Sequence, residues 1–210
     1  MSEIKQNANK KGLLVVVSGP SGVGKGTVLS KVLESSDEYV YSVSATTREP
    51  REGDKDGVNY FFISKQEFEK RIEEDKFLEY AEYNGNYYGT PKDYVEKKLA
   101  EGKNVFLEIE VQGAMQIKTK CPDAFMVFIA PESKEALIER LKGRATETEE
   151  AINNRIKIAE RELRACLIYD RIAINETGKI DECAADVMAA VRAEKLKPER
   201  IFDKIKQFIQ

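Results

Sequence analysis

The stretch Gly19-Pro20-Ser21-Gly22-Val23-Gly24-Lys25-Gly26-Thr27 decides how the rest of this 210-residue chain is interpreted. It follows an apolar run at residues 13–17 and precedes helix-like apolar spacing at residues 28–33, which predicts a strand, a glycine-rich turn and a helix. The spacing G-x-x-x-x-G-K lets backbone N–H groups and one lysine converge on a phosphate at a helix N-terminus. It predicts a nucleoside triphosphate site; a loop that merely turns the chain is the alternative.

Gly26 departs from the usual form of this loop. The pattern normally has Ser or Thr at that position, where the hydroxyl group binds a magnesium ion. Thr27 lies one residue further on. We therefore expect water to take the place of the direct hydroxyl ligand.

Composition indicates one compact unit in a reducing, cytoplasmic compartment. The chain has 41% hydrophobic residues, three cysteines without a C-x-x-C pair, and no histidine. No structural zinc is expected. The polar first eleven residues lack the apolar core of a secretory signal, and no apolar run reaches the ~18 residues of a membrane span. The oligomeric state stays open between monomer and homodimer.

The net charge of −3 argues against a general nucleic-acid surface, which normally carries a basic excess. Polyanionic ligands would have to meet local basic clusters, and Arg48 and Arg51 form one of them. The absence of histidine removes the commonest general base. Phosphoryl transfer onto a phosphate tolerates this, because it depends mainly on positioning and charge neutralisation.

Periodicity predicts strands separated by helices. Strands are expected at residues 13–17, 39–43, 60–63, 77–83, 86–89, 105–109, 125–129 and 172–174. Helices are expected at residues 25–34, 64–75, 91–101, 111–120, 133–141, 149–169 and 180–195, with a further amphipathic helix after Pro198. Ser64 with Glu67 predicts a capping box, and Thr90 with Pro91 an N-cap followed by a first-turn proline. Residues 44–54 are expected to be a loop.

This order of elements predicts an α/β fold with a doubly wound parallel sheet. The dipeptide Asn84-Gly85 is a hairpin signal, so a small antiparallel lobe is expected as an insertion. The apolar face of the last helix is expected to pack on the body of the protein, with a second subunit as the alternative. Ligands of such sheets bind at the carboxyl ends of the strands, where the phosphate loop, residues 44–51 and residues 108–110 would meet.

The chain resembles the guanylate kinases, in the nucleoside-monophosphate kinase group of P-loop kinases. The resemblance covers roughly residues 11–195 and is carried by several separate motifs. Besides the loop, these are S-V-S-A-T-T-R-E-P-R at residues 42–51, G-N-Y-Y-G-T at 85–90, E-I-E-V-Q-G at 108–113, and L-K-G-R at 141–144 followed by T-E-T-E-E at 146–150. The second and third motifs are far more specific than the loop.

The resemblance implies transfer of the terminal phosphate of ATP to GMP, with Mg²⁺, giving ADP and GDP. ATP would be held by Gly19, Ser21, Gly22, Val23, Gly24, Lys25, Gly26, Thr27 and Asn175. The GMP phosphate would be held by Arg48, Arg51, Tyr60 and Tyr88. The guanine base would be held by Ser44, Glu79, Thr90 and Glu110.

Glu79 would discriminate between bases, because a carboxylate accepts the N1–H and N2–H donors of guanine and repels the N1 lone pair of adenine. An outward-facing strand carboxylate is the alternative for Glu79. Glu108 and Glu110 stand where the family usually has Asp. Which of the two carboxylates contacts guanine and which contacts hydrated magnesium is left open. The metal ligands are left open, and Glu108 acting through water is the candidate.

The catalytic residues implied by the resemblance are Lys25, Arg140, Arg144 and Arg155, the arginines neutralising the transferred phosphoryl group. The alternative for Arg155 is a solvated helix face. The whole chain, 1–210, would form one domain with a core at 11–43 and 90–197, a GMP-binding lobe at 44–89, a lid at 142–155 and a terminal helix at 198–210.

Two other functions remain to be excluded. One is a kinase for another nucleoside monophosphate, since a loop ending in Lys-Gly-Thr also suits adenylate kinase-like proteins. The other is a catalytically inactive module that binds protein partners. The presence of Lys25 and the lid arginines argues against the second.

Overall fold

In this computed structural model, residues 11–142 and 149–209 are described. The central sheet contains β1 (Leu14–Ser18), β2 (Tyr39–Tyr41), β7 (Asn104–Glu108), β8 (Phe125–Pro131) and β9 (Arg171–Asn175). Its strand order is β2-β7-β1-β8-β9, and every adjacent pair is parallel. The expected doubly wound parallel sheet is confirmed.

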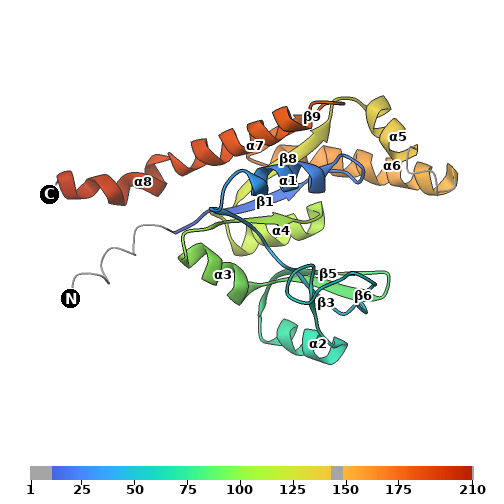
Figure 1. The fold of residues 1–210 in the computed structure, drawn as a ribbon, viewed down its shortest axis with the longest axis horizontal. Helices are drawn as coiled ribbons and strands as arrows, with labels where there is room; N and C mark the ends of the chain where they lie inside the picture. The colour runs from blue at the N-terminus through green and yellow to red at the C-terminus, as the bar shows by residue number, and fades with distance from the viewer. Residues whose placement is uncertain (1–10, 143–148, 210) are drawn as a thin grey trace.

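Helices cover both faces of this sheet (Figure 1). On one face, α1 (Lys25–Glu34) and α7 (Ile180–Lys195) pack over Val15 and Val17 of β1. On the other face, α3 (Lys92–Ala100) and α4 (Val111–Lys120) pack over Leu14 and Val16. Successive side chains of a strand point to opposite faces, so the continuous apolar run of β1 is buried on both sides.

The inserted lobe forms a second sheet of β3 (Ala45–Thr46), β4 (Phe61–Phe62), β5 (Phe77–Tyr83) and β6 (Asn86–Pro91), in the order β4-β3-β6-β5. The pairs β3·β6 and β5·β6 are antiparallel, and the short pair β3·β4 is parallel. The helix α2 (Lys65–Glu73) covers this sheet through Phe68, whose ring stacks on Phe77 and Tyr87 at 4.3 and 5.2 Å.

Several expected boundaries were wrong. Strand β2 ends at Tyr41 instead of residue 43, and Ala45 and Thr46 form a strand inside the expected loop because they pair with β6.

The expected helix caps were only partly correct. Thr90 lies in β6, and its hydroxyl group donates to Glu79 rather than capping α3. Ser64 caps α2 as expected, although the Glu67 carboxylate accepts from Arg71.

Two helices lie near the phosphate loop: α5 (Lys134–Lys142) and α6 (Glu149–Arg164). They share a small core in which Ala159 packs with Leu137 and Leu141. The expected continuous helix to residue 169 ends earlier, at Arg164, and a 3₁₀ turn follows (Ala165–Ile168). Arg144 and residues 143–148 of the expected lid lie outside the described residues.

The last helix, α8 (Pro198–Ile205), is followed by a 3₁₀ turn (Lys206–Phe208) and extends away from the sheet (Figure 1). Arg200 anchors its start, with Nε and Nη2 donating to the buried Glu194 at 3.0 and 2.9 Å. Beyond this anchor, Phe202 and Phe208 are 51% and 81% exposed. The expectation that this apolar face packs on the body is therefore wrong for these side chains.

Two further features of the described residues bear on the sequence expectations. Cys121, Cys166 and Cys183 are free thiols. Within residues 11–142 and 149–209, no helix has the length and apolar character needed to cross a bilayer.

Candidate active site

The phosphate loop connects β1 to α1 and lies at the carboxyl edge of the central sheet. Gly24 has φ = 93°, a left-handed conformation that residues with a Cβ adopt only rarely. This conformation turns the chain into the first turn of α1, where backbone N–H groups have no intrahelical partner and can bind an anion. The expected strand, turn and helix are all present.

The Lys25 ammonium group folds back onto this loop. Its Nζ donates to the carbonyl oxygens of Gly19 at 2.6 Å and Pro20 at 3.2 Å. Burial lowers the pKa of Lys25, and nearby carboxylates oppose that shift. These carboxylates are Glu108 at the end of β7, Glu110 immediately before α4, and Glu162 on α6.

Glu108, the last residue of β7, lies beside Gly26. A Cβ built on Gly26 would be 3.6 Å from Glu108 Oε2, an ordinary van der Waals distance. Burial raises the pKa of Glu108, and Lys25 opposes the shift. Among the described residues, no group of three or more ligand-type side chains could hold a metal by itself. Mg²⁺ bound with phosphates usually needs only one or two carboxylates besides water, so Glu108 fits that requirement.

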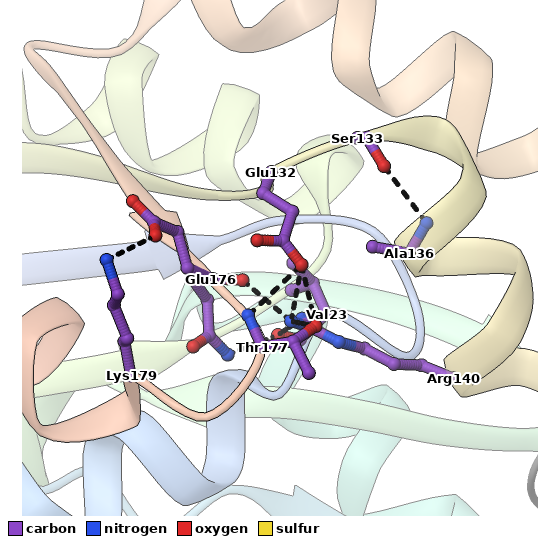
Figure 2. Close-up of polar contacts among 9 residues, drawn as sticks. Val23, Glu132, Ser133, Ala136, Arg140, Glu176, Thr177 and Lys179 are labelled. Atoms are coloured by element: carbon purple, nitrogen blue, oxygen red, sulfur yellow. Dashed lines mark hydrogen bonds and ion pairs between the residues drawn. The ribbon is translucent and has the colours of Figure 1, made fainter.

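Arg140 reaches from α5 to the outer side of the loop (Figure 2). Its guanidinium donates to Val23 O at 3.3 Å, Asn175 O at 2.8 Å and Thr177 Oγ1 at 3.1 Å. The side chain of Asn175 is buried and donates from Nδ2 to Val23 O at 2.7 Å. Asn175 therefore braces the loop in this structure.

Arg155 approaches the loop from α6, where its Nη2 donates to Ser21 Oγ at 2.7 Å. Thr27 is exposed in the first turn of α1. The structure thus brings Arg140 and Arg155, from two different helices, onto one loop. The third arginine of the expected set, Arg144, is outside the described residues.

A second basic and aromatic cluster lies in the lobe. The Arg48 guanidinium lies 5.4 Å from the centroid of the Tyr60 ring, and the Tyr60 and Tyr88 rings meet edge-on at 6.0 Å. Arg48 Nη2 and the Arg51 backbone N–H both donate to Asp54 Oδ2 at 2.8 Å. The structure therefore groups Arg48, Tyr60 and Tyr88, while the Arg51 side chain is exposed at the edge of this cluster.

The Glu79 carboxylate is buried, with only 6% of the residue exposed. Thr90 Oγ1 donates to Glu79 Oε1 at 2.6 Å. Burial raises the pKa of Glu79, while hydrogen bonds from the Thr90 side chain and backbone oppose the shift. A Cβ on Gly113 would lie 2.7 Å from Glu79 Oε2, so a larger residue at the start of α4 would displace the Glu79 carboxylate. The alternative of an outward-facing carboxylate is excluded.

The other two expected guanine contacts lie at the margins of this region. Ser44 is half-buried, and its carbonyl oxygen accepts from Phe61 N at 2.9 Å. Glu110 is exposed at the N-cap of α4. Burial raises the pKa of the Tyr41 hydroxyl group, and the nearby Glu108 and Tyr60 add to this shift, so Tyr41 lies close to both sites.

Sequence reasoning missed five residues that shape this region. Asp54 holds Arg48, Tyr41 lies between the two sites, and Gly113 makes room for Glu79. The side chain of Gln116 exchanges two hydrogen bonds with the backbone of Tyr80, at 3.2 and 2.9 Å, joining α4 to the lobe. Glu162 lies near Lys25. Gly113 alone carried a signal, as the last residue of the motif at 108–113.

A cavity of about 690 Å³ lies at the opposite end of the central sheet, where Leu13, Ala124 and Ile201 are among its lining residues. The candidate site residues are at the carboxyl ends of the strands instead. The site is therefore defined by its chemistry: a phosphate loop with two arginines, and a lobe with an arginine–tyrosine cluster and a buried carboxylate.

This combination defines the class of P-loop kinases that bind a second, phosphate-bearing substrate. The guanylate kinase family model matches residues 11–194. A guanylate kinase from Shouchella clausii is 48% identical over 201 residues, covering 96% of this chain and 97% of the relative. The crystal structure of guanylate kinase from Anaplasma phagocytophilum superposes with a TM-score of 0.71 at 33% identity, covering 91% of this chain and 90% of the other. The chain belongs to the guanylate kinase family.

Proposed function

We propose that this enzyme transfers the terminal phosphate of ATP to GMP, producing ADP and GDP. The observation that carries the proposal is the buried Glu79 carboxylate, bonded to Thr90 in the same lobe as the Arg48, Tyr60 and Tyr88 cluster. The Glu79 carboxylate suits a base with two adjacent hydrogen-bond donors, and the arginine–tyrosine cluster suits a phosphate. The family shared with the Shouchella clausii and Anaplasma phagocytophilum guanylate kinases supports this choice.

On this proposal, ATP binds with its phosphates on the N–H groups of the loop and with Lys25 turned from the loop carbonyls towards them. The loop contacts are Gly19, Ser21, Gly22, Val23, Gly24, Lys25, Gly26 and Thr27. Asn175 is assigned to adenine by the family resemblance, and its Nδ2 would have to leave Val23 O to make that contact.

The GMP phosphate is bound by Arg48, Arg51, Tyr60 and Tyr88. Arg48 exchanges part of its bonding to Asp54 for the phosphate, because a dianion competes well for a guanidinium. The guanine base is recognised by Ser44, Glu79, Thr90 and Glu110. An acceptor nucleotide without the N1–H and N2–H donors would leave the buried Glu79 with unmet hydrogen-bonding capacity.

Magnesium supplies charge neutralisation between the ATP phosphates. Glu108 would hold it through water, beside Gly26, where the protein lacks the usual loop hydroxyl. The two arginines that touch the loop, Arg140 and Arg155, together with Arg144, neutralise the charge of the transferred phosphoryl group. The acceptor is itself an anionic phosphate oxygen, so these steps need no histidine.

We further propose that the core consists of residues 11–43 and 90–197, the GMP-binding lobe of residues 44–89, and the lid of residues 142–155. Closure of the lobe and lid would exclude water, which otherwise competes with GMP for the phosphoryl group. A coupled assay of ADP release with GMP, AMP, CMP and UMP as acceptors tests the proposal. A clear preference for GMP is expected, and a preference for another acceptor would refute it.

A further inference from the structure

The side chain of Gln116, on α4, binds the backbone of Tyr80, the residue that follows Glu79 in β5. Its Nε2 donates to Tyr80 O at 2.9 Å, and its Oε1 accepts from Tyr80 N at 3.2 Å. Strand β5 is an edge strand, since the order of the lobe sheet is β4-β3-β6-β5. The amide of Gln116 therefore supplies the pair of hydrogen bonds that a neighbouring strand would give to this edge residue.

The ladder between β5 and β6 is irregular beside this contact. Its register shifts between Phe77 and Tyr80. The two residues in between, Leu78 and Glu79, lie opposite the single residue Thr90. An extra residue of this kind bends a strand and changes the direction of its side chains. The position of Glu79 therefore depends on contacts outside the ladder as well as on β6.

One face of α4 supplies such contacts along β5. Gly113, Gln116 and Lys120 are three and four residues apart, so they share a face of the helix. At Gly113 the helix passes close to the Glu79 carboxylate, because a Cβ there would lie 2.7 Å from Oε2. Lys120 Nζ donates to Phe77 O at 2.9 Å. Gln116 lies between these two positions and holds the backbone next to Glu79.

The apolar side chains of β5 are divided between the core and the lobe. Leu78 packs in the same buried cluster as Ala114 and Ile117 of α4, whereas Tyr80 packs against the lobe cluster that contains Phe68. Apolar contacts are non-directional, so they permit β5 to slide on α4 by small amounts. The two hydrogen bonds of Gln116 are directional and fix one position.

We propose that Gln116 is a positioning residue for acceptor selection: its amide fixes β5 on α4 and thereby holds the Glu79 carboxylate where it meets the guanine base. The inference rests on the assignment of Glu79 to guanine under the proposed function. Both polar atoms of the Gln116 side chain are engaged with Tyr80, so Gln116 acts through the strand. A misplacement of about 1 Å in a binding group can cost about 10²-fold, and a partial shift of β5 would cost less.

The test compares the wild type with Gln116→Met, which keeps an unbranched side chain of similar length and removes both hydrogen bonds. We expect the KM for GMP to rise about tenfold, while kcat and the KM for ATP stay within about twofold. A second acceptor, inosine 5′-monophosphate, keeps N1–H and lacks the N2 amino group. The ratio of kcat/KM for GMP to that for inosine monophosphate should fall about fivefold, because a displaced carboxylate loses the N2–H bond. A loss of folded protein would lower both values equally.

A double-mutant cycle assigns the effect to Glu79. In the Glu79→Gln background, Gln116→Met should change the KM for GMP by less than about twofold. Thr119→Val is the matched control on α4, because Thr119 is exposed and its hydroxyl group donates to Met115 O within the helix at 3.1 Å. It should behave as wild type. If Gln116→Met fails to fold, Gln116→Glu, which keeps an acceptor for the Tyr80 N–H and removes the donor, takes its place with the same expected result.

Three results would overturn the inference and leave the proposed function intact, provided that the wild type prefers GMP. One is an unchanged KM for GMP in the Gln116 variant. Another is a raised KM with an unchanged ratio between the two acceptors, which would indicate a general structural effect. The third is an equal effect in both backgrounds, which would show that Gln116 acts independently of Glu79. A wild type without any preference for GMP would instead remove the role of Glu79 and this inference with it.

Discussion

Thr90 Oγ1 donates a 2.6 Å hydrogen bond to Oε1 of Glu79, and both residues are at least 94% buried, with exposures of 1% and 6%. This bond satisfies only part of the acceptor capacity of a carboxylate, which has about four lone-pair sites. A guanine base offers two adjacent donors to the remainder. Under the proposed function, the relationship between these residues links the fold of the lobe to acceptor selection.

Glu79→Gln should reduce kcat/KM for GMP about 10²-fold, because the amide offers one acceptor and places a donor against a donor of guanine. Steady-state kinetics with GMP varied at saturating ATP measure this. The control is Glu82→Gln, an exposed carboxylate three residues later on the same strand, which should behave as wild type. Equal kinetics in both variants would contradict the assignment of Glu79.

The same substitution should stabilise the fold at neutral pH. Burial raises the pKa of Glu79 above its ordinary value of 4.5, so the charged form is disfavoured in the native state. The native protein binds this proton more tightly than the unfolded chain, and its stability rises as the pH falls through the raised pKa. Glu79→Gln should therefore melt at a higher temperature than wild type at pH ~8, with a difference that narrows towards pH ~5. A difference that widened on acidification would contradict the burial argument.

Lys25→Ala should lower kcat by about 10³-fold or more while the protein remains folded, because the loop loses its only phosphate-directed ammonium group. Circular dichroism and thermal melting check the fold alongside the kinetic assay. Lys31→Ala is the matched control on the same helix, since Lys31 is exposed and pairs with Asp181 at 2.8 Å. Near-normal turnover in Lys25→Ala would refute the phosphate-binding role.

Gly26→Ser should restore a hydroxyl group beside Glu108 without a clash, since the atom nearest to a Cβ there, Glu108 Oε2, is 3.6 Å away. We expect stability to rise by about 0.5 kcal/mol from helix propensity. The Mg²⁺ concentration for half-maximal activity should fall, because the metal gains a direct ligand. A higher Mg²⁺ requirement in this variant would count against placing the metal beside Gly26.

Local patterns predicted the central sheet and the loop because their signals lie within short stretches. Residues 19–27 and the apolar run before them determine a strand, a turn and a helix in sequence order. The position and hydrogen bond of Thr90 could not be predicted in the same way. A Thr-Pro pair is a common helix start, and only the hairpin partner Glu79, eleven residues earlier, draws the hydroxyl group into a different bond.

Except for Asp54, the missed residues have partners that are distant in the chain. Glu162 lies near Lys25, about 140 residues earlier in the chain, and the sequence of its helix is typical of a solvated, charged surface. Tyr41 and Gln116 act across the boundary between the core and the lobe. Neither Tyr41 nor Gln116 belongs to a sequence motif that would have indicated its role. The apolar face of α8 could be predicted only in part. Amphipathic spacing predicts that a helix forms, but it does not predict whether the apolar side chains of that helix are buried.

The central claim is that a triphosphate loop and a guanine-selective lobe form one phosphotransferase. The most direct measurement is ATP-dependent ADP release with GMP, AMP, CMP and UMP compared at equal concentrations. The kcat/KM for GMP is expected to be at least about 10²-fold above that for each of the other three acceptors. Equal rates with all four, or a preference for AMP, would contradict it.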